Sequence, residues 1–178
     1  MTRITGTFLA LKELKRPSVG SSTTEAAKRK SPVPESASES LLRIGRNCCG
    51  IAQARRVAPL VDGDAYYWSS VDPFTHDGYP EKLIEMSEAV HADGGLWVAP
   101  AAPGFDARLL GGQRAIERRD GETLRAELNA ALQSSPDVIG LISWNEFSEN
   151  SHIEPSQEHG NQYLDVIGEV LPIIPSPR

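Results

Sequence analysis

The sequence predicts an α/β fold in which helices cover a parallel sheet on both faces, and three observations support this prediction. Short apolar runs alternate with longer segments of helical periodicity between residues 57 and 172. The last of these runs, "VIGLIS" at residues 138–143, is continuously apolar, whereas a strand with one face in water would alternate with polar residues. Proline and glycine stand at the segment boundaries. Strands and helices that alternate in this way favour parallel strands joined by helical connections.

The first predicted strand and helix lie between residues 57 and 94. The strand falls in "VAPLVDGDAYYW" (57–68), which is rich in Val and in aromatic residues. The helix covers 79–94, with Pro80 near its start and Gly94 at its end, as helix boundaries commonly show. Its apolar residues recur at helical spacing and are Leu83, Ile84, Met86 and Val90.

The next four elements repeat this order. A short apolar strand in 94–104 is followed by a long polar loop and then by a helix in 119–137. The apolar residues of that helix again have helical spacing and are Leu124, Leu128, Ala131 and Leu132. The strand at 138–143 follows, and a last helix in 159–172 ends at Pro172. The ordered part therefore reads β-α-β-α-β-α.

The front of the chain has a different composition and charge. Residues 1–45 are basic and rich in Pro and Ser, with few large apolar side chains, and we expect them to be disordered. Residues 1–56 hold 11 Lys/Arg against 4 Asp/Glu, whereas residues 57–178 hold 7 against 20. An acidic ordered part argues against nucleic acid as a partner. We therefore divide the chain into a disordered segment (1–45) and an ordered domain (46–178).

Membrane and compartment signals are lacking in this sequence. No apolar run approaches the roughly 20 residues that a membrane span needs, so we expect no membrane partner. The first residues do not form the apolar region and cleavage site of a signal peptide, which favours the cytoplasm by default.

Three βα units leave two architectures open. A closed (β/α)8 barrel needs about 250 residues, so the chain is either a small open α/β domain or the last three or so units of a barrel. Residues 1–56 do not supply the missing units, and we therefore expect a fragment of a larger TIM barrel. A partial barrel exposes strand edges, which predicts self-association through those edges.

The stretch "SWNEFSENSHIEPS" (143–156) carries the clearest chemical signal, because it follows the last strand. Parallel α/β folds bind ligands at the carboxyl ends of their strands. Glu146 and Glu149 lie three residues apart, so a helical turn would place both carboxylates on one face. Two carboxyl groups beside Trp144 and Asn145 fit glycoside hydrolysis, with a proton donor, a second carboxylate, a flat surface for a sugar and an amide for a hydroxyl. The alternative is a polar loop whose Trp packs in the core.

This stretch resembles the C-terminal signature Trp-Asn-Glu-aromatic-x-Glu-…-Ile-Glu-Pro of the family 99 glycoside hydrolases, the endo-α-mannosidase and endo-α-mannanase group. It is also similar to family 71 α-1,3-glucanase-like proteins and to a group linked to lipopolysaccharide synthesis. The resemblance covers residues 60–170 and implies a (β/α)8 barrel that acts on an α-linked glycan of mannan or glucan type without a metal or other cofactor. It implies that Glu146 assists attack by the sugar's own 2-hydroxyl, that Glu149 is the general acid/base, and that Glu154 helps to shape the site.

Two further residues are weighed as substrate ligands, and one alternative function stays open. Trp68 ends the first predicted strand, where it stacks on a sugar or packs in the core. Asp106 follows the second strand, where it binds a hydroxyl or pairs with Arg108. The histidines show no metal-ligand spacing. The alternative to a hydrolase is a non-catalytic remnant, a partial barrel that binds glycan weakly.

Overall fold

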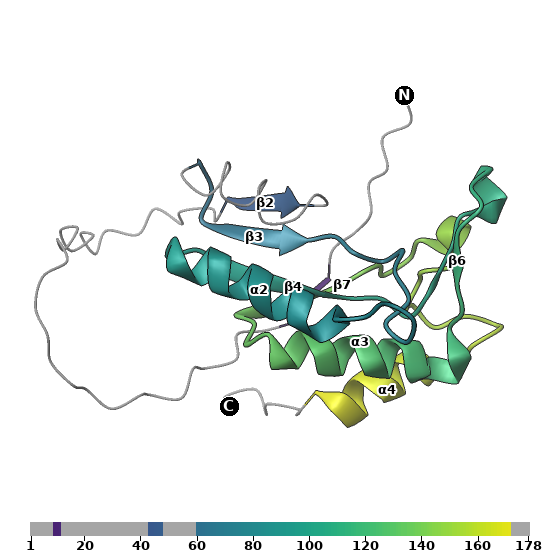
Figure 1. Ribbon diagram of the computed structural model, residues 1–178. Helices are drawn as coiled ribbons and strands as arrows, with labels where there is room; N and C mark the ends of the chain where they lie inside the picture. The colour runs from purple at the N-terminus through teal and green to yellow at the C-terminus, as the bar shows by residue number, and fades with distance from the viewer. Residues whose placement is uncertain (1–8, 12–42, 48–59, 172–178) are drawn as a thin grey trace, which may run out of the picture.

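The computed structural model describes residues 9–11, 43–47 and 60–171, and its centre is a five-stranded sheet (Figure 1). The strand order is β1-β7-β4-β3-β2. Four adjacent strands are parallel to one another, namely β2 (Ile44–Asn47), β3 (Gly63–Tyr66), β4 (Leu96–Ala101) and β7 (Val138–Leu141). The first strand, β1 (Leu9–Leu11), pairs antiparallel with β7. The described α-helices are α2 (Tyr79–Ala92), α3 (Glu122–Gln133) and α4 (Gln162–Val170).

The predicted α/β class and the parallel arrangement are confirmed. Each of the three predicted strands and three predicted helices contains an observed element of the same type, although the observed elements are shorter. The helix α2 begins with Pro at its second residue and ends before Gly94, whose φ of 74° is in the left-handed region. A glycine adopts that conformation without the steric cost that a Cβ atom adds.

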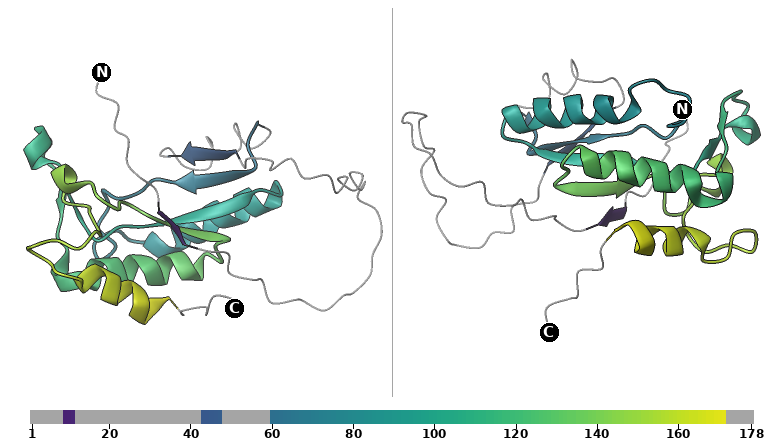
Figure 2. Two further views of the ribbon diagram at one scale, coloured as in Figure 1. Left: turned by 180° about the vertical axis from the view of Figure 1, so that it is seen from behind. Right: turned by 60° about the horizontal axis from the view of Figure 1, so that its bottom comes forward.

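The helices differ from the prediction in their placement. In Figures 1 and 2, α2, α3 and α4 lie in a row along one face of the sheet instead of covering both. The strand order explains this arrangement, because β2, β3, β4 and β7 lie next to one another in the order of the sequence. Right-handed connections that always move in the same direction place every helix on the same face. A (β/α)8 barrel is built in this way.

The front of the chain contains two strands where disorder was predicted. Leu9–Leu11 forms β1, and β2 begins at Ile44 within the expected disordered segment. These strands are three and four residues long and pair with distant parts of the chain, so local composition does not reveal them. The other residues of the segment 1–42 lie outside the described part.

Two apolar clusters join the helices to the sheet. One contains Leu83 and Met86 of α2 with Trp97 of β4, and all three side chains are fully buried. The second contains Leu124 and Leu128 of α3. Alternate residues of β4 contribute to the sheet side of both clusters, and alternate residues of β7 contribute to the second, as the two-residue repeat of a strand requires. The sheet and its helices thus form one support for the loops at the strand ends.

The connections at the carboxyl ends of the strands carry additional structure. After β4, a hairpin forms from β5 (Phe105–Asp106) and β6 (Ala115–Ile116), with the 3-10 turn η2 (Arg108–Leu110) between them. After β7 comes the 3-10 turn η4 (Phe147–Glu149). Among the described residues, no helix is both long and apolar enough to cross a membrane.

Candidate active site

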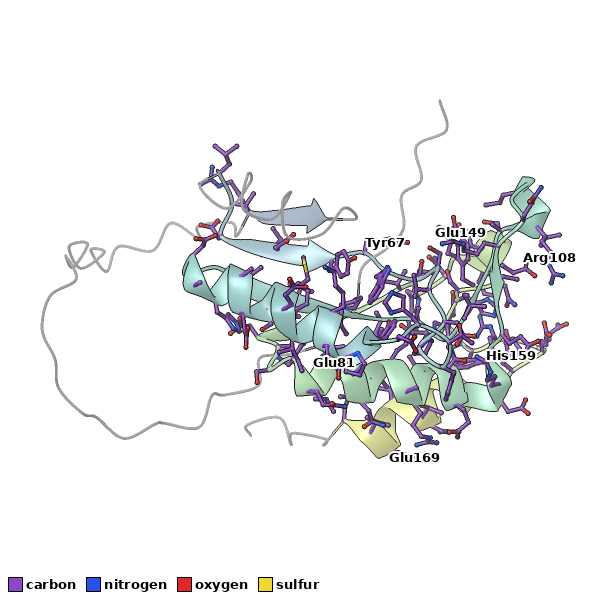
Figure 3. The ribbon with its side chains drawn as sticks, in the orientation of Figure 1. Tyr67, Glu81, Arg108, Glu149, His159 and Glu169 are labelled. Atoms are coloured by element: carbon purple, nitrogen blue, oxygen red, sulfur yellow. The ribbon has the colours of Figure 1, made fainter. Side chains whose placement is uncertain are left out.

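Three neighbouring strands end on the same side of the molecule, and the candidate residues follow those ends. Trp68 comes after β3, Asp106 after β4, and the stretch that begins at Ser143 after β7. Figure 3 shows Glu149, Arg108 and His159 at this end of the molecule. Parallel strands bring their carboxyl ends to one edge, so sequence positions that are far apart come together there.

The segment from Ser143 to Glu154 folds back on itself as a tight loop. The backbone N–H of Ser143 donates to the carbonyl of Ser151 (2.8 Å), and the N–H of Ile153 donates to the carbonyl of Ser143 (3.0 Å). The N–H of Ser151 donates to the carbonyl of Glu146 (3.2 Å). These bonds close the loop at its base and in its middle, so the two glutamates project from a fixed backbone.

The two glutamates lie at the two ends of one short turn but have different surroundings. Glu149 is the last residue of η4 and is buried, with a relative exposure of 9%. Glu146 directly precedes η4, with a non-helical ψ of 75°, and is half-buried. Its backbone N–H donates to Ser143 Oγ (2.9 Å), and its Oε1 accepts a hydrogen bond from Ser148 Oγ (2.9 Å). The expected helical turn therefore covers Phe147–Glu149 and does not include Glu146.

The other candidates on this loop flank the glutamates. Trp144 is half-buried and packs against the second apolar cluster, which contains Leu124 and Leu128 of α3. It therefore combines a core contact with an exposed part. Asn145 is exposed. Glu154 is half-buried, and its backbone N–H donates to the carbonyl of Trp144 (2.8 Å), which holds the two residues side by side.

Arg118 fixes the second half of the loop, and the sequence reasoning missed it. Its Nε donates to Asn150 Oδ1 (3.0 Å) and its Nη2 donates to the carbonyl of His152 (2.8 Å), so one guanidinium bridges both residues. The guanidinium also lies over the ring of Tyr163 at 4.4 Å from its centroid. Arg118 is buried, and burial lowers its pKa. A planar fork with several donors suits this double contact, whereas a lysine has one ammonium nitrogen.

His152 is buried in the loop and held as a neutral imidazole. Arg118 Nη2 lies 3.2 Å from its Nδ1. A guanidinium only donates, so Nδ1 accepts and the imidazole proton is on Nε2. Burial, and then the positive charge of Arg118, lower the pKa of His152 to about 4. Its ring stacks on Phe147 at 4.1 Å, which leaves Phe147 49% exposed on the turn between the glutamates.

Trp68 packs mainly against other aromatic rings. It stacks on Tyr79 with centroids 4.6 Å apart and an interplanar angle of 6°, and His76 meets it edge-on at 5.1 Å. It is half-buried and packs against the first apolar cluster, which contains Leu83 and Met86 of α2. One ring face is therefore occupied by Tyr79, and any sugar contact is limited to the remaining surface.

Asp106 pairs with Arg108, which was one of the two expected roles. Arg108 Nε donates to Asp106 Oδ1 (2.9 Å) and Nη2 donates to Oδ2 (2.6 Å). These bonds hold the pKa of Asp106 at about 2. The two residues flank the start of η2 in the hairpin after β4, so the ion pair orders the hairpin tip next to the glutamate loop.

No pattern in the sequence predicted the contact between Arg118 and this loop. Arg118 and Asn150 are separated by 32 positions, and "IERRDG" is an ordinary polar stretch. Only the pairing of strands brings the hairpin and the loop together. Within the described residues, no group of three His, Cys, Asp or Glu side chains is placed to hold a metal ion.

Comparison with known proteins identifies the architecture. No family model and no curated protein matches the sequence. Two solved structures of the GH99 endo-alpha-mannosidase from Bacteroides thetaiotaomicron are similar, one of them in complex with BIS-TRIS-Propane. Their TM-scores are 0.55 and 0.54 at 25% identity, over 64% and 63% of this chain. The match spans 36% and 33% of those chains, about a third of their length. The chain therefore has the fold of part of a glycoside hydrolase (β/α)8 barrel, and the predicted resemblance is confirmed.

Proposed function

We propose that this chain is a glycoside hydrolase that acts on an α-linked glycan of mannan or glucan type through Glu146 and Glu149. The observation that carries the proposal is the pair of glutamates on one tight loop at the carboxyl end of β7, in a sheet with a glycosidase-like fold. Ligand sites of parallel barrels lie at this end of the strands. The endo-α-mannosidase activity of the similar structures supports the substrate class.

The different surroundings of the two carboxyl groups support different roles. Glycosidases commonly use a shielded carboxylic acid as proton donor and a more solvated carboxylate as its partner. Glu149 is the more buried residue and is proposed as the general acid, which protonates the oxygen of the leaving sugar. Glu146 is proposed to accept the proton of the sugar's 2-hydroxyl as that oxygen attacks the anomeric carbon. Water then opens the resulting three-membered ring, with Glu149 as base and Glu146 as acid.

The neighbouring side chains are proposed to bind the glycan. Asn145 is exposed beside Glu146 and offers an amide to a hydroxyl, and Trp144 and Trp68 offer partly exposed aromatic surfaces. Glu154 is held next to Trp144 by the backbone and is proposed to shape the wall of the site. Asp106 contributes through its ion pair with Arg108 rather than as a free carboxylate.

Hydrolysis of α-mannan and α-1,3-glucan by purified protein tests the proposal. Glu146→Gln and Glu149→Gln are each expected to lower kcat by about 100-fold or more, because each removes a proton-transfer group. Glu88→Gln is the matched control, since Glu88 is exposed on α2 and should leave the rate unchanged. Equal residual rates in the parent and in both loop variants would contradict the assignment.

A second candidate is a partial barrel that binds glycan without cleaving it. The observation in its favour is β1, which lies antiparallel on the outer edge of β7, where a closed barrel continues with a parallel strand. Among the described strands, the outer two, β1 and β2, are not paired with each other. Saturable binding of mannan oligosaccharides without release of reducing ends would favour this candidate over the hydrolase.

A further inference from the structure

A pocket separate from the two glutamates lies between the β5–β6 hairpin and the end of the glutamate loop. Its volume is about 260 Å³. Pockets for drug-sized ligands run from about 300 to 1,000 Å³, so this one suits a single small ring. Asn150 lines the pocket and directly follows Glu149, which joins the pocket to the proposed catalytic loop.

The lining of the pocket combines apolar and polar side chains. The hairpin supplies apolar Phe105, Ala115 and Ile116 as well as the ion pair of Asp106 and Arg108. The other lining residues are polar or charged, and they are Glu117, Arg118, Asn150, Glu158 and His159. A hexose has the same mixed character, because its C–H groups form apolar patches while its hydroxyls project from the ring edge.

Two residues that line this pocket have side-chain nitrogens with unused hydrogen-bonding capacity. Arg118 Nη1 and His159 Nε2 are buried without a hydrogen-bond partner among the described residues, and both side chains line the pocket. Asn150 Oδ1 already accepts from Arg118, which leaves its amide nitrogen as a donor. Buried polar groups are nearly always hydrogen-bonded, so these groups favour a polar occupant.

The charge around the pocket favours a neutral occupant. Asp106 and Arg108 neutralise each other in their ion pair. Arg118 then contributes +1, and Glu117 and Glu158 contribute −2, which leaves the lining at −1. His159 adds no charge, because burial and then Arg118 lower its pKa. Hydroxyl groups both donate and accept, so they match a wall that contains both donors and carboxylates. An anionic sugar would be repelled by the carboxylates of Glu117 and Glu158.

We propose that this pocket, lined by Phe105, Ala115, Ile116, Arg118, Asn150 and His159, is a subsite for one neutral hexose unit of the glycan. The inference rests on the proposed function for its ligand class. It adds a recognition element outside the pair of glutamates, reached from Glu149 through Asn150.

Binding by a full-length Glu149→Gln variant tests the subsite without turnover. The probes are α-1,6-linked mannotetraose and α-1,3-linked glucotetraose, measured by isothermal titration calorimetry. Adding Ala115→Trp fills the pocket from an exposed position, and we expect Kd for the better probe to rise about tenfold or more, which is about 1.4 kcal/mol. Leu109→Trp is the matched control, because Leu109 is 81% exposed in the same hairpin and does not line the pocket. Its Kd should stay within about twofold of the parent.

The outcomes separate the subsite from the hydrolase proposal. Circular dichroism checks that each variant is folded, and Ala115→Leu provides a smaller filling residue should the Trp variant unfold. Unchanged affinity in a folded pocket-filled variant would overturn the subsite, and so would the absence of binding by the parent. Tighter binding of an α-linked galacturonate tetramer than of both neutral probes would overturn the choice of a neutral sugar. Binding that the pocket variant weakens, in a protein that hydrolyses neither glycan, would support the subsite and defeat only the hydrolase.

Discussion

Arg118 ties the second half of the glutamate loop to the segment that follows the β5–β6 hairpin. It holds Asn150 through Nε and His152 through Nη2, and the ring of Tyr163 lies against its guanidinium. Charged hydrogen bonds of this kind contribute about 1.5–3 kcal/mol each. Arg118 is therefore a positioning residue, which acts on Glu149 through the backbone that follows it.

Two substitutions of Arg118 separate its charge from its geometry. In Arg118→Met the loss of the positive charge should raise the pKa of His152 from about 4 toward 6.5, and it should stay below 6.5 because burial is the larger cause of the shift. In Arg118→Lys the charge remains, so this pKa should stay low, while the double contact to Asn150 and His152 is lost. NMR titration of the imidazole measures both variants, and a His152 that titrates identically in the parent and in Arg118→Met would contradict the assigned contact.

Glu127 gives a second prediction at this scale. Its side chain is fully buried on α3, its Oε2 accepts the backbone N–H of Ala102 (2.6 Å), and burial raises its pKa well above 4.5. The folded protein therefore keeps this proton at pH values where the unfolded chain has lost it. This group's contribution to stability is complete below pH 4.5 and is lost as the pH rises toward the folded pKa.

Glu127→Gln removes that titration while it keeps an acceptor for Ala102. We expect the free energy of unfolding of the variant minus that of the parent to increase steadily between pH 5 and pH 8. Urea unfolding at each pH measures both values. Comparison of the two proteins cancels the opposite contribution of His152, whose lowered pKa removes stability as the pH falls from 6.5 toward 4. A difference that does not change with pH would mean that Glu127 is ionised in the folded state.

At the scale of elements, α3 is the helix that joins the two apolar clusters. Its residues Ala130 and Ala131 pack with α2, while Leu124 and Leu128 pack with α4 and β7. Leu128→Ala should lower the free energy of unfolding by about 2–5 kcal/mol, since it removes fully buried methyl groups and leaves a cavity. Leu109→Ala, at an exposed position, should change it by less than about 0.5 kcal/mol. Chemical denaturation measures both values, and similar midpoints for the two variants would argue against α3 as the junction.

The elements also show which signals a sequence contains. The helices α2, α3 and α4 could be predicted because apolar side chains recur at helical spacing over several turns, and β7 because its apolar run is continuous. The strands β1 and β2 could not, because they are short and their partners are distant in sequence. The motif around Glu146 pointed to a site, whereas the bridge from Arg118 to Asn150 needed the fold to bring two loops together.

For the whole molecule, the order of the strands decides the architecture. Because β2, β3, β4 and β7 are neighbours in sequence order, their helices lie on one face, and the chain matches part of a barrel rather than a doubly wound sheet. The structural match spans about a third of the solved endo-alpha-mannosidase chains. Within the described part of the chain, the loops after β3, β4 and β7 belong to the barrel rim.

The bridge made by Arg118 has a consequence for exchanging parts between related barrels. The arginine belongs to the segment that follows the β5–β6 hairpin, and its two acceptors belong to the loop after β7. A chimaera that imports one of these segments alone would leave a buried cation facing foreign acceptors. The two segments therefore depend on each other, and a functional chimaera has to receive both from the same parent protein.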